Sequence, residues 1–328
     1  MKPDGAVERY KARLVAKGCS QIEGVDYVES FSLVAKAVTV RILLSVASAK
    51  NWPIHQLDIN NSFLHGFLDE DIYMTPPEGY SVTSGSVCKL KRSLYGLKQA
   101  SRQWNLEFTS KLTQFGFQQS QHDHYLFIKH TDSGMLVFLV YVDDVLLTGP
   151  CESSIVEVKR YLDELFTIKD LGHAKFFLGL EIAWSTQGTL VMQSKFIRDI
   201  IHDNGLFDAK ATHTPFPMGV KLTADSGALL TNPEPFRRLV GRLLYLGFAR
   251  PDISHGAQQL SQFVQRPCQQ HLDVALHLVR YLKGCSTQGL FFPVNNDLNL
   301  HGYSDVDWAT CSDSRKSLTE RAKCKFPI

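Results

Sequence analysis

The 328 residues carry 35 Lys and Arg against 33 Asp and Glu, which gives a formal net charge of +2. This near balance excludes a uniformly basic nucleic-acid-binding protein, but it allows a local basic groove beside an acidic centre. A hydrophobic content of 44% with 21% charged residues argues against disorder, and the length predicts about two domains, or three if one is incomplete.

The cysteines and the apolar runs narrow the class of protein. Seven cysteines form no Cys-x-x-Cys pair, so neither a disulfide framework nor a zinc ribbon is predicted. The spacing of Cys268, His271, His277 and Cys285 matches no common zinc module. The amino terminus has no apolar signal region, and no apolar stretch is long enough to span a bilayer. We therefore expect an intracellular protein that is not secreted and has no membrane partner.

Hydrophobic periodicity predicts helices and strands in mixed order, with no fixed-period repeat. Asn60, Asn61 and Ser62 predict a helix start directly after the strand predicted at 54–59. In chain order the segments are an exposed basic strand at 9–16, a helix at 38–49, a strand at 54–59, a basic approach at 89–92 leading into a helix with apolar positions up to Phe115, a hairpin around 135–147, a helix starting at Ser154 with a capping box to Glu157, hairpin strands at 175–182 and 189–193, a helix at 194–204, a linker at 212–217, and mostly helices until Leu298.

Asp143 and Asp144 separate two apolar runs, 135–142 and 145–147. Two strand-forming runs separated by two residues predict a β-hairpin with both carboxylates at its tip. Desolvation and mutual repulsion raise the pKa of such a pair or recruit a cation, and a divalent metal is the natural solution. An acidic turn alone is usually a solvated loop. Asp58 ends the predicted strand at 54–59, so the three aspartates form a metal site if the fold brings them together.

Three blocks of sequence, Gln56 to Gly66, Ser93 to Ala100 and Tyr141 to Asp144, resemble the successive motifs of copia-type retrotransposon reverse transcriptases. Their order and spacing both agree with that family. The resemblance begins at Arg9 to Gly18 and continues to Arg280 to Gly284, so it covers nearly the whole chain. A lone Tyr-x-Asp-Asp is a weak signal, whereas several blocks in order are a specific one.

The resemblance implies an α+β fold of the right-hand polymerase type, with fingers, palm and thumb, followed by a mostly helical connection and a truncated RNase H-like start. The implied domains are 1–211 (fingers and palm, truncated at the amino terminus), 212–297 (a thumb or connection-like helical region) and 298–328 (an incomplete RNase H-like segment). The implied activity is that of an RNA-directed DNA polymerase, which extends a primer on an RNA or DNA template with dNTPs. Asp58, Asp143 and Asp144 are then the catalytic and metal-binding residues, which hold two Mg²⁺ ions or Mn²⁺ as a substitute.

Other roles follow from motif position alone. Phe63 resembles the bulky residue beneath the incoming sugar, where its ring would clash with a 2′-hydroxyl. A core aromatic or a solvated strand face would also explain several of these residues. The implied dNTP-binding residues are Lys11, Arg13, Ile59, Phe63 and Tyr95, and the implied nucleic-acid-binding residues are Gly96, Lys98, Arg102, Tyr141, Leu178 and Gly179.

The two ends of the chain carry further expectations. Gly302 to Ala309 resembles the opening strand of an RNase H domain, in which Asp305 is the first metal ligand. One carboxylate cannot build a two-metal nuclease, so no RNase H activity is expected. The start inside the fingers leaves an alternative open, which is a catalytically inactive remnant that at most binds nucleic acid. The resemblance implies a location in a cytoplasmic virus-like particle or in the nucleus.

Overall fold

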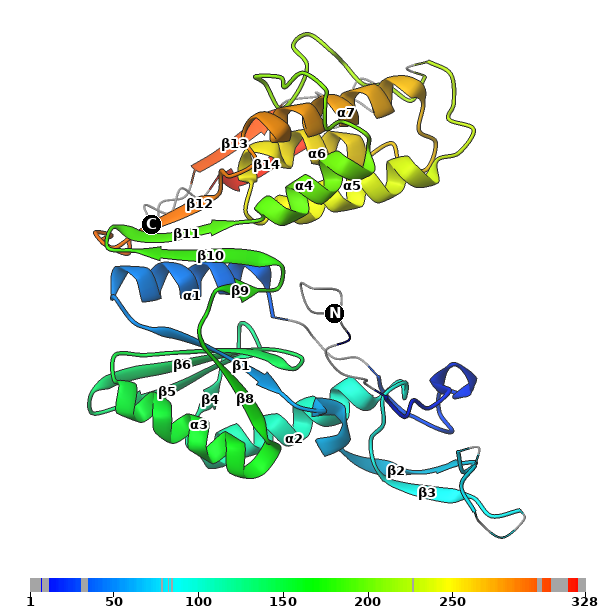
Figure 1. Cartoon of the computed structure of the whole chain (residues 1–328), viewed down its shortest axis with the longest axis vertical. Coiled ribbons are helices and arrows are strands. Elements are labelled where there is room, and N and C mark those ends of the chain that lie inside the picture. The colour runs from blue at the N-terminus through cyan, green and yellow to red at the C-terminus, as the bar shows by residue number, and fades with distance from the viewer. Residues whose placement is uncertain are drawn as a thin grey trace. The chain divides into compact units, whose positions relative to one another are not determined.

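The computed structural model describes residues 7, 12–30, 35–77, 79–81, 83, 85–225 and 227–299, and the backbone of 303–307 and 318–323. The chain has a mixed α/β fold (Figure 1). It divides into two compact units, Met1–Val40 with Trp52–His173 (unit 1) and Arg41–Asn51 with Ala174–Ile328 (unit 2). Every helix in the part of the chain that the structure describes is too short or too polar to cross a lipid bilayer.

Unit 1 is built on a six-stranded antiparallel sheet with the strand order β4-β5-β6-β7-β1-β8. Strand β1 comes earliest in the sequence but lies between two of the latest strands, so segments far apart in the chain become neighbours. The strands are β1 (Ile54–Ile59), β4 (Gln118–Gln119), β5 (Leu126–Thr131), β6 (Gly134–Tyr141), β7 (Asp144–Thr148) and β8 (Ile168–His173).

Two helices, α2 (Ala100–Gln114) and α3 (Glu152–Phe166), pack on this sheet (Figure 1). Phe108 of α2 packs against Phe138 of β6 with ring centroids 5.8 Å apart and the rings tilted, and both are fully buried. Tyr161 of α3 donates a hydrogen bond to the carbonyl of Lys111 at 3.0 Å, which ties the two helices together. The apolar layer between the helices and the sheet is therefore the core of unit 1, and burying such aromatic rings supplies most of its stability.

A two-stranded hairpin and a short helix complete unit 1. Strand β2 (Phe67–Met74) pairs with β3 (Cys88–Arg92), and the 3₁₀ helix η2 (Ser62–His65) precedes them. A small apolar cluster lies between this hairpin and the turn before α2; it contains Ile72, Leu97 and Ala100 as buried members, with Ala16, Phe63, Leu68, Leu90 and Leu94 packed around them.

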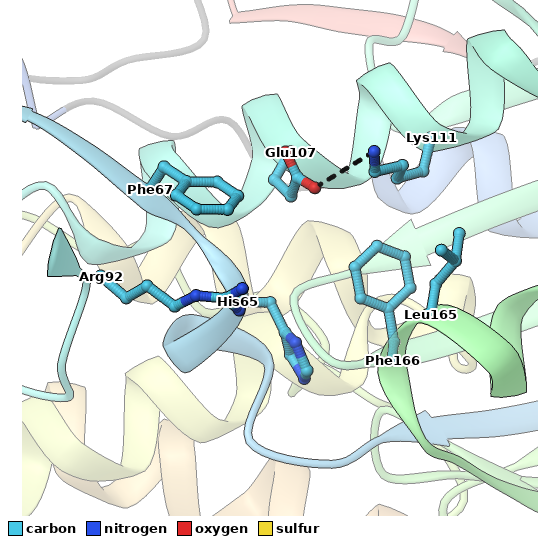
Figure 2. Close-up of a pocket in the computed structure, with 7 residues that line it drawn as sticks. All are labelled: His65, Phe67, Arg92, Glu107, Lys111, Leu165 and Phe166. Atoms are coloured by element: carbon cyan, nitrogen blue, oxygen red, sulfur yellow. Dashed lines mark ion pairs between the residues drawn. The ribbon is translucent and has the colours of Figure 1, made fainter.

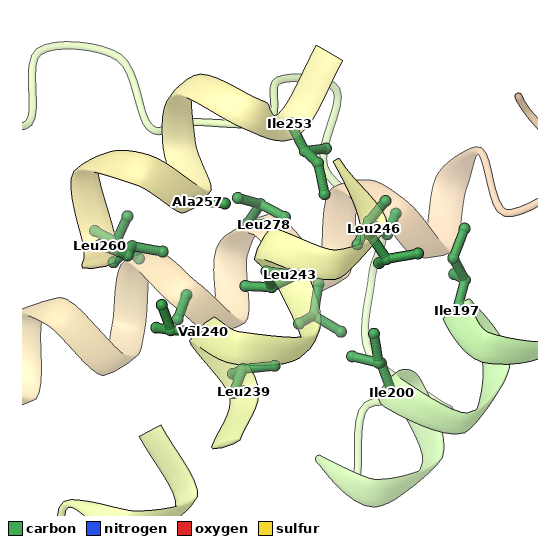
Figure 3. Packing of buried hydrophobic residues seen from close by; sticks show 14 of the residues in the cluster. Ile197, Ile200, Leu239, Val240, Leu243, Leu246, Ile253, Ala257, Leu260 and Leu278 are labelled. Carbon is green, nitrogen blue, oxygen red and sulfur yellow. The ribbon is translucent and has the colours of Figure 1, made fainter. Parts of the chain in front are cut away.

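Unit 2 is held together by a helical core in which the apolar faces of four helices meet (Figure 3). Burial follows the helical repeat, as at Leu239, Leu243 and Leu246, because one face of each helix points inward. The four helices are α4 (Ser194–Asp203), α5 (Glu234–Leu246), α6 (Ser254–Ser261) and α7 (Gln269–Gly284), and the 3₁₀ helix η3 (Pro251–Ile253) precedes α6. Unit 1 contains a further 3₁₀ helix, η1 (Gly18–Ser20).

A four-stranded antiparallel sheet in the order β12-β11-β10-β9 also belongs to unit 2. Helix α1 (Ala37–Ala49), most of which belongs to this unit, donates from Ser48 Oγ to the carbonyl of Phe292 at 2.7 Å. The strands are β9 (Phe176–Phe177), β10 (Leu180–Ser185), β11 (Gly188–Met192) and β12 (Leu290–Pro293), and a separate backbone pair is β13 (Tyr303–Asp307) with β14 (Leu318–Lys323).

A buried arginine network closes the helical core of unit 2. Arg250 is 1% exposed, and its guanidinium donates two hydrogen bonds, of 2.9 and 2.7 Å, to the carboxylate of Asp252. The same guanidinium donates to the carbonyl of Cys285 at 2.8 Å, while the Tyr281 hydroxyl donates to Asp252 at 2.8 Å. The buried charge of Arg250 is therefore well satisfied by hydrogen bonds. Removing one partner would destabilise the protein, because it would leave part of this buried charge uncompensated.

Several predicted elements are confirmed. The helix at 38–49 appears as α1, the strand at 54–59 has the same bounds as β1, and the helix at 194–204 appears as α4. Gly116 follows α2 with a φ of 95° and Gly205 follows α4 with a φ of 63°, as expected of helix-ending glycines.

Other predicted elements are wrong in their bounds. The helix predicted to follow the basic approach at 89–92 begins only at Ala100, and the approach itself lies in β3, because its backbone pairs with β2. Helix α3 begins at Glu152 and not at Ser154, and its first turn has no side-chain cap from Cys151. Asn61 adopts a left-handed conformation without capping η2, so the expected helix after β1 is only a single 3₁₀ turn. Of the basic strand predicted at 9–16, residues 12–16 contain a single β-bridge, between Val15 and Tyr95.

The domain organisation stays a prediction. The linker predicted at 212–217 lies within unit 2, and the change from one unit to the other comes at His173 and Ala174.

Candidate active site

Asp58 and Asp144 are direct partners across two central strands of the unit 1 sheet. The register pairs Asp58 of β1 with Asp144 of β7, and it pairs Asp144 on its other side with Tyr141 of β6. Directly opposed residues in an antiparallel pair have Cβ atoms about 5 Å apart. Asp58, Tyr141 and Asp144 are all half-buried, so the two carboxylates, near the end of β1 and at the start of β7, are partly accessible to solvent.

The turn between β6 and β7 consists of Val142 and Asp143, which corrects the prediction that Asp143 and Asp144 together form the tip. Asp143 is at the tip, whereas Asp144 is already the first residue of β7. Two donors hold the turn: the Trp104 indole donates from Nε1 to the Val142 carbonyl at 2.7 Å, and the Ile59 N–H donates to the Asp143 carbonyl at 2.9 Å. The hairpin is therefore attached to both α2 and β1.

The electrostatics of Asp144 reflect its crowded position. Burial is the largest cause that raises the pKa of its carboxyl, and the negative charges of Asp143 and Asp58 raise it further. A hydrogen bond with the Gln56 side chain acts in the opposite direction without cancelling the rise. Ionisation of Asp144 beside these two charges is therefore disfavoured, and a bound cation would offset the cost.

These carboxylates do not form a closed metal-binding group. Among the described residues, no three His, Cys, Asp or Glu side chains converge as a ready-made metal-binding group. The nearest candidate ligands are the opposed residues Asp58 and Asp144, with Asp143 next to Asp144 in the chain, and all three offer hard carboxylate oxygens. Such a set suits Mg²⁺, which keeps several waters and needs only one or two protein carboxylates alongside substrate phosphates.

Three of the predicted dNTP-binding residues lie together. The Arg13 guanidinium lies over the Tyr95 ring at 4.8 Å, and the Tyr95 ring lies 5.1 Å from that of Phe63. Phe63 belongs to η2, four residues beyond Ile59 of β1, so this stack begins directly after the strand that carries Asp58. Lys11 lies outside the described residues.

Gly96 allows the Arg13 segment to lie against Tyr95. Its φ is 93°, and a Cβ on Gly96 would lie 2.1 Å from the carbonyl oxygen of Ala16. This close approach lets Ala16 N–H donate to the Tyr95 carbonyl at 2.7 Å. Only glycine combines the positive φ with the absence of a side chain that this crossing requires.

Lys98 and Arg102, which the resemblance assigns to nucleic acid, both have partners within unit 1. The Lys98 ammonium donates to the Gln21 carbonyl and to the Tyr27 hydroxyl, each at 3.3 Å. Arg102 forms an ion pair with Glu29 at 3.2 Å. A phosphate would have to compete with these contacts, which are exposed and therefore weak.

Leu178 and Gly179 form the two-residue turn between β9 and β10 in unit 2. Their φ values are 50° and 72°, as in the type I′ turns that favour tight hairpins. The Tyr245 hydroxyl donates to the Leu178 carbonyl at 2.5 Å. Asp305 lies in β13, and its side chain is outside the described residues.

A cavity of about 260 Å³ lies on the helical side of unit 1 (Figure 2). Its basic and acidic residues include Lys111 and Glu107, which form an ion pair at 3.7 Å, and Arg92, whose guanidinium lies 4.7 Å over the Phe67 ring. None of the three aspartates lines it. The lining residues are His65, Phe67, Arg92, Glu107, Lys111, Leu165 and Phe166.

Two residues of this region have contacts that the sequence did not predict. Trp104 stands at an apolar position of a helical repeat, which indicates only a core residue, whereas its indole also reaches the turn that carries Asp143. A buried tryptophan usually finds a partner for its N–H, and that is the one signal in the sequence. Gln56 is 8% exposed on a strand otherwise rich in apolar side chains, and a buried amide there needs a partner, which is Asp144.

Comparison with known proteins gives a consistent answer. Residues 1–218 match the family model for reverse transcriptase (RNA-dependent DNA polymerase). The chain is 42% identical over 312 residues to the retrovirus-related Pol polyprotein from transposon RE1 of Arabidopsis thaliana, which covers 94% of this chain and 21% of that protein. It is 36% identical over 333 residues to the Pol polyprotein from transposon TNT 1-94 of Nicotiana tabacum, which covers 97% and 25%.

A yeast relative has nearly the same extent as this chain. The putative transposon Ty5-1 protein of Saccharomyces cerevisiae is 31% identical over 261 residues, covering 78% of this chain and 85% of that protein. Among solved structures, a foamy viral protease-reverse transcriptase in complex with double-stranded DNA matches with a TM-score of 0.45 and 13% identity, over 84% of this chain and 41% of that chain.

The chain spans about a fifth to a quarter of the plant polyproteins that it matches. The family model nevertheless covers most of the chain, and the polyprotein relatives cover nearly all of it. The chain therefore belongs to the reverse transcriptase (RNA-dependent DNA polymerase) family, in the form found in the Pol polyproteins of copia-type retrotransposons.

Proposed function

We propose that this chain catalyses RNA-directed DNA synthesis, extending a primer with dNTPs at a centre made by Asp58, Asp143 and Asp144. The observation that carries the proposal is the register of β1 and β7, which pairs Asp58 with Asp144 directly beside the turn residue Asp143. In this proposal unit 1 contains the palm and part of the fingers of a right-hand polymerase. Membership of the reverse transcriptase family supports the assignment of this reaction.

The three carboxylates would hold two Mg²⁺ ions, or Mn²⁺ as a substitute. When bound, the ions supply the charge neutralisation that phosphoryl transfer requires at its attacking, bridging and leaving oxygens. The raised pKa of Asp144 supports this role, because the repulsion that raises it is relieved by a cation. The carbonyl of Ile59 would be an additional ligand, while its N–H keeps the Asp143 backbone in place.

The stack of Arg13, Tyr95 and Phe63 would receive the incoming dNTP. Arg13 would meet the triphosphate charge, because a guanidinium donates to phosphate oxygens in pairs. Phe63 would lie under the sugar and exclude a 2′-hydroxyl, and its contact with Tyr95 at 5.1 Å would hold the ring in place. Lys11 is proposed as a second cation for the triphosphate from its motif position.

Motif position suggests the residues that would contact the template and primer, which can be RNA or DNA. Lys98 would exchange a carbonyl and a hydroxyl for phosphates, which are stronger acceptors, and Arg102 would exchange the Glu29 carboxylate for a phosphate. The Leu178–Gly179 turn would present backbone groups to the primer. The remaining proposed contacts are Gly96 and Tyr141.

The test is primer extension on an RNA template with the purified chain, compared with an Asp143→Asn variant. Asp132→Asn is a matched control, because Asp132 is an exposed residue in the turn between β5 and β6 of the same sheet. We expect extension by the wild type and by Asp132→Asn, and a loss of at least about 100-fold for Asp143→Asn, because a misplaced or missing catalytic group costs that order of rate. Thermal melting of all three proteins checks that they are folded.

Two outcomes would contradict the proposal. Equal extension by the wild type and Asp143→Asn would show that synthesis does not depend on this centre. Binding of a labelled template-primer without extension by the wild type would favour a non-catalytic protein that only binds nucleic acid. Omitting divalent metal from the assay should abolish primer extension without changing the melting temperature of the protein.

A further inference from the structure

The indole of Trp104 holds the backbone of the turn that carries Asp143. Trp104 lies in α2 and is 2% exposed, and its Nε1 donates to the carbonyl of Val142 at 2.7 Å. This contact joins residues 38 positions apart in the sequence. It is a hydrogen bond to the backbone, so it bears on the position of the turn whatever the side chain of Val142 is.

The turn needs such support because its conformation is unfavourable. Val142 has a φ of 61°, in the left-handed region that β-branched residues seldom adopt. A strained residue of this kind persists only where its surroundings determine its conformation. One such determinant is the Ile59 N–H, which fixes the carbonyl of Asp143, and the other is Trp104, which fixes the carbonyl of Val142.

Trp104 is itself held firmly. Its ring lies 4.9 Å from that of Phe108 and 5.2 Å from that of Phe166, edge to face in the second case. The centroid of the His65 ring lies 5.9 Å from that of the Trp104 ring. Gly66 follows His65, and a Cβ on Gly66 would lie 2.7 Å from the Trp104 backbone nitrogen. The close approach of these two backbones leaves Trp104 little freedom to shift.

Two of the residues that pack against Trp104, His65 and Phe166, also line the cavity in Figure 2. Residues that line the cavity therefore contact Trp104, and Trp104 holds the turn between β6 and β7.

We propose that Trp104 is a positioning residue for the active centre: it holds the Val142–Asp143 turn so that Asp143 and Asp144 stay aligned with Asp58. This rests on the proposed function. Trp104 contacts no reacting atom, and its effect passes through the backbone of the turn.

The experiment removes the donor and keeps the shape of the side chain. Trp104 is replaced by benzothienylalanine, in which a sulfur takes the place of the indole N–H, and in a second variant by phenylalanine (Trp104→Phe). Phe117→Leu is the matched control, because Phe117 is 1% exposed and packs on Phe138 of the same core. Each protein is measured by primer extension, by urea unfolding, and by hydrogen–deuterium exchange of the 141–145 backbone.

We expect the benzothienylalanine protein to lose about tenfold in kcat, with KM for dNTP changed less than about twofold, because alignment and not binding is lost. Exchange at 141–145 should rise about tenfold, since a lost hydrogen bond releases the strained turn. Phe117→Leu should lower stability while leaving exchange at 141–145 and kcat near wild type.

Wild-type kcat and wild-type exchange in the benzothienylalanine protein would overturn the proposal. An equal loss of kcat in Phe117→Leu at equal stability would also overturn it, because loosening of the core would then explain the effect. If the wild type itself does not extend a primer, the proposed function fails separately. The exchange measurement then decides whether Trp104 holds the turn: raised exchange supports the proposal and unchanged exchange refutes it.

Discussion

Replacing Gly96 with alanine should separate residues 13–16, the Arg13 segment, from Tyr95. The φ of Gly96 is 93°, and an added Cβ would lie 2.1 Å from the Ala16 carbonyl oxygen and 2.8 Å from Val15 Cγ1. Real Cβ atoms do not approach a backbone oxygen so closely, so the 15–16 segment has to move. The change therefore combines backbone strain with a steric displacement.

The magnitude follows from the contacts that are lost. Alanine at a positive φ costs about 1 to 2 kcal/mol. Loss of the hydrogen bond from Ala16 N–H to the Tyr95 carbonyl adds about 0.5 to 1.5 kcal/mol, and loss of the exposed Arg13–Tyr95 contact adds about 0.5 to 1 kcal/mol. The expected destabilisation for Gly96→Ala is therefore about 2 to 4.5 kcal/mol.

Gly116→Ala is the matched control for this change. Gly116 has nearly the same φ, 95°, but the nearest atom to an added Cβ is Lys129 Cε at 3.5 Å, an ordinary contact with a flexible side chain. It should therefore show the backbone cost alone, about 1 to 2 kcal/mol. Urea unfolding followed by tryptophan fluorescence measures both variants.

Under the proposed function, Gly96→Ala should also raise KM for dNTP about three- to tenfold, because Arg13 and Tyr95 are separated. Gly116→Ala should leave KM unchanged. If the two variants lose the same stability to within about 0.5 kcal/mol and have the same KM, the crossing at Gly96 does not hold the Arg13 segment, and the reasoning fails.

Two further predictions concern strain and charge. Val142→Gly should raise the free energy of unfolding by about 1 kcal/mol, because it removes the cost of a positive φ and adds a smaller entropy cost; urea unfolding should show a gain larger than that of Val142→Ala, and an equal gain would contradict the argument. Burial opposes ionisation of Asp252, but hydrogen bonds from Arg250 and Tyr281 outweigh it and lower the pKa of that carboxyl. The stability that this provides is complete above the ordinary carboxyl pKa and is lost as pH falls through the lower folded value. Asp252→Asn should cost about 2 kcal/mol at neutral pH, because Asp252 is partly exposed, and it should flatten the dependence of the urea midpoint on pH below about 4; an unchanged acid dependence would refute the assignment.

Local sequence was sufficient where one segment determines its own structure. The strand β1 and the helix α4 follow from hydrophobic period and from end signals such as Gly205, so their predicted bounds hold. The pairing of Asp58 with Asp144 needed more than local pattern. Only the order of several motifs indicated that these two segments belong to one site.

Where tertiary contacts compete with local preference, the prediction was wrong. Asp143 and Asp144 are turn-forming residues, whereas valine resists a positive φ, so the turn was expected one residue later than it occurs. Pairing of Asp144 with both Asp58 and Tyr141 draws it into β7, and the Trp104 indole stabilises the unfavourable conformation of Val142. Neither partner can be identified from the sequence around residue 142.

Lys89 and Lys91 show the same limit in a different way. They were predicted to lead into a helix, which left open whether they form a loop or a strand, and their backbone pairs with β2, a strand that begins at Phe67. The exposure of the alternate residues in β3 is compatible with either structure. The pairing partner decides between them, and it lies outside any local window.

The position of β1 between β7 and β8 has a consequence for biosynthesis. As the chain leaves the ribosome, β1 emerges long before either of its sheet neighbours, so it has no partner in this sheet until β7 has been made and gains its second neighbour only when β8 is complete at His173. Pairings between such distant segments raise contact order and slow folding. The two opposed aspartates therefore come together only after β7 has been made, and a nascent chain that stops before β7 carries Asp58 without its counterpart.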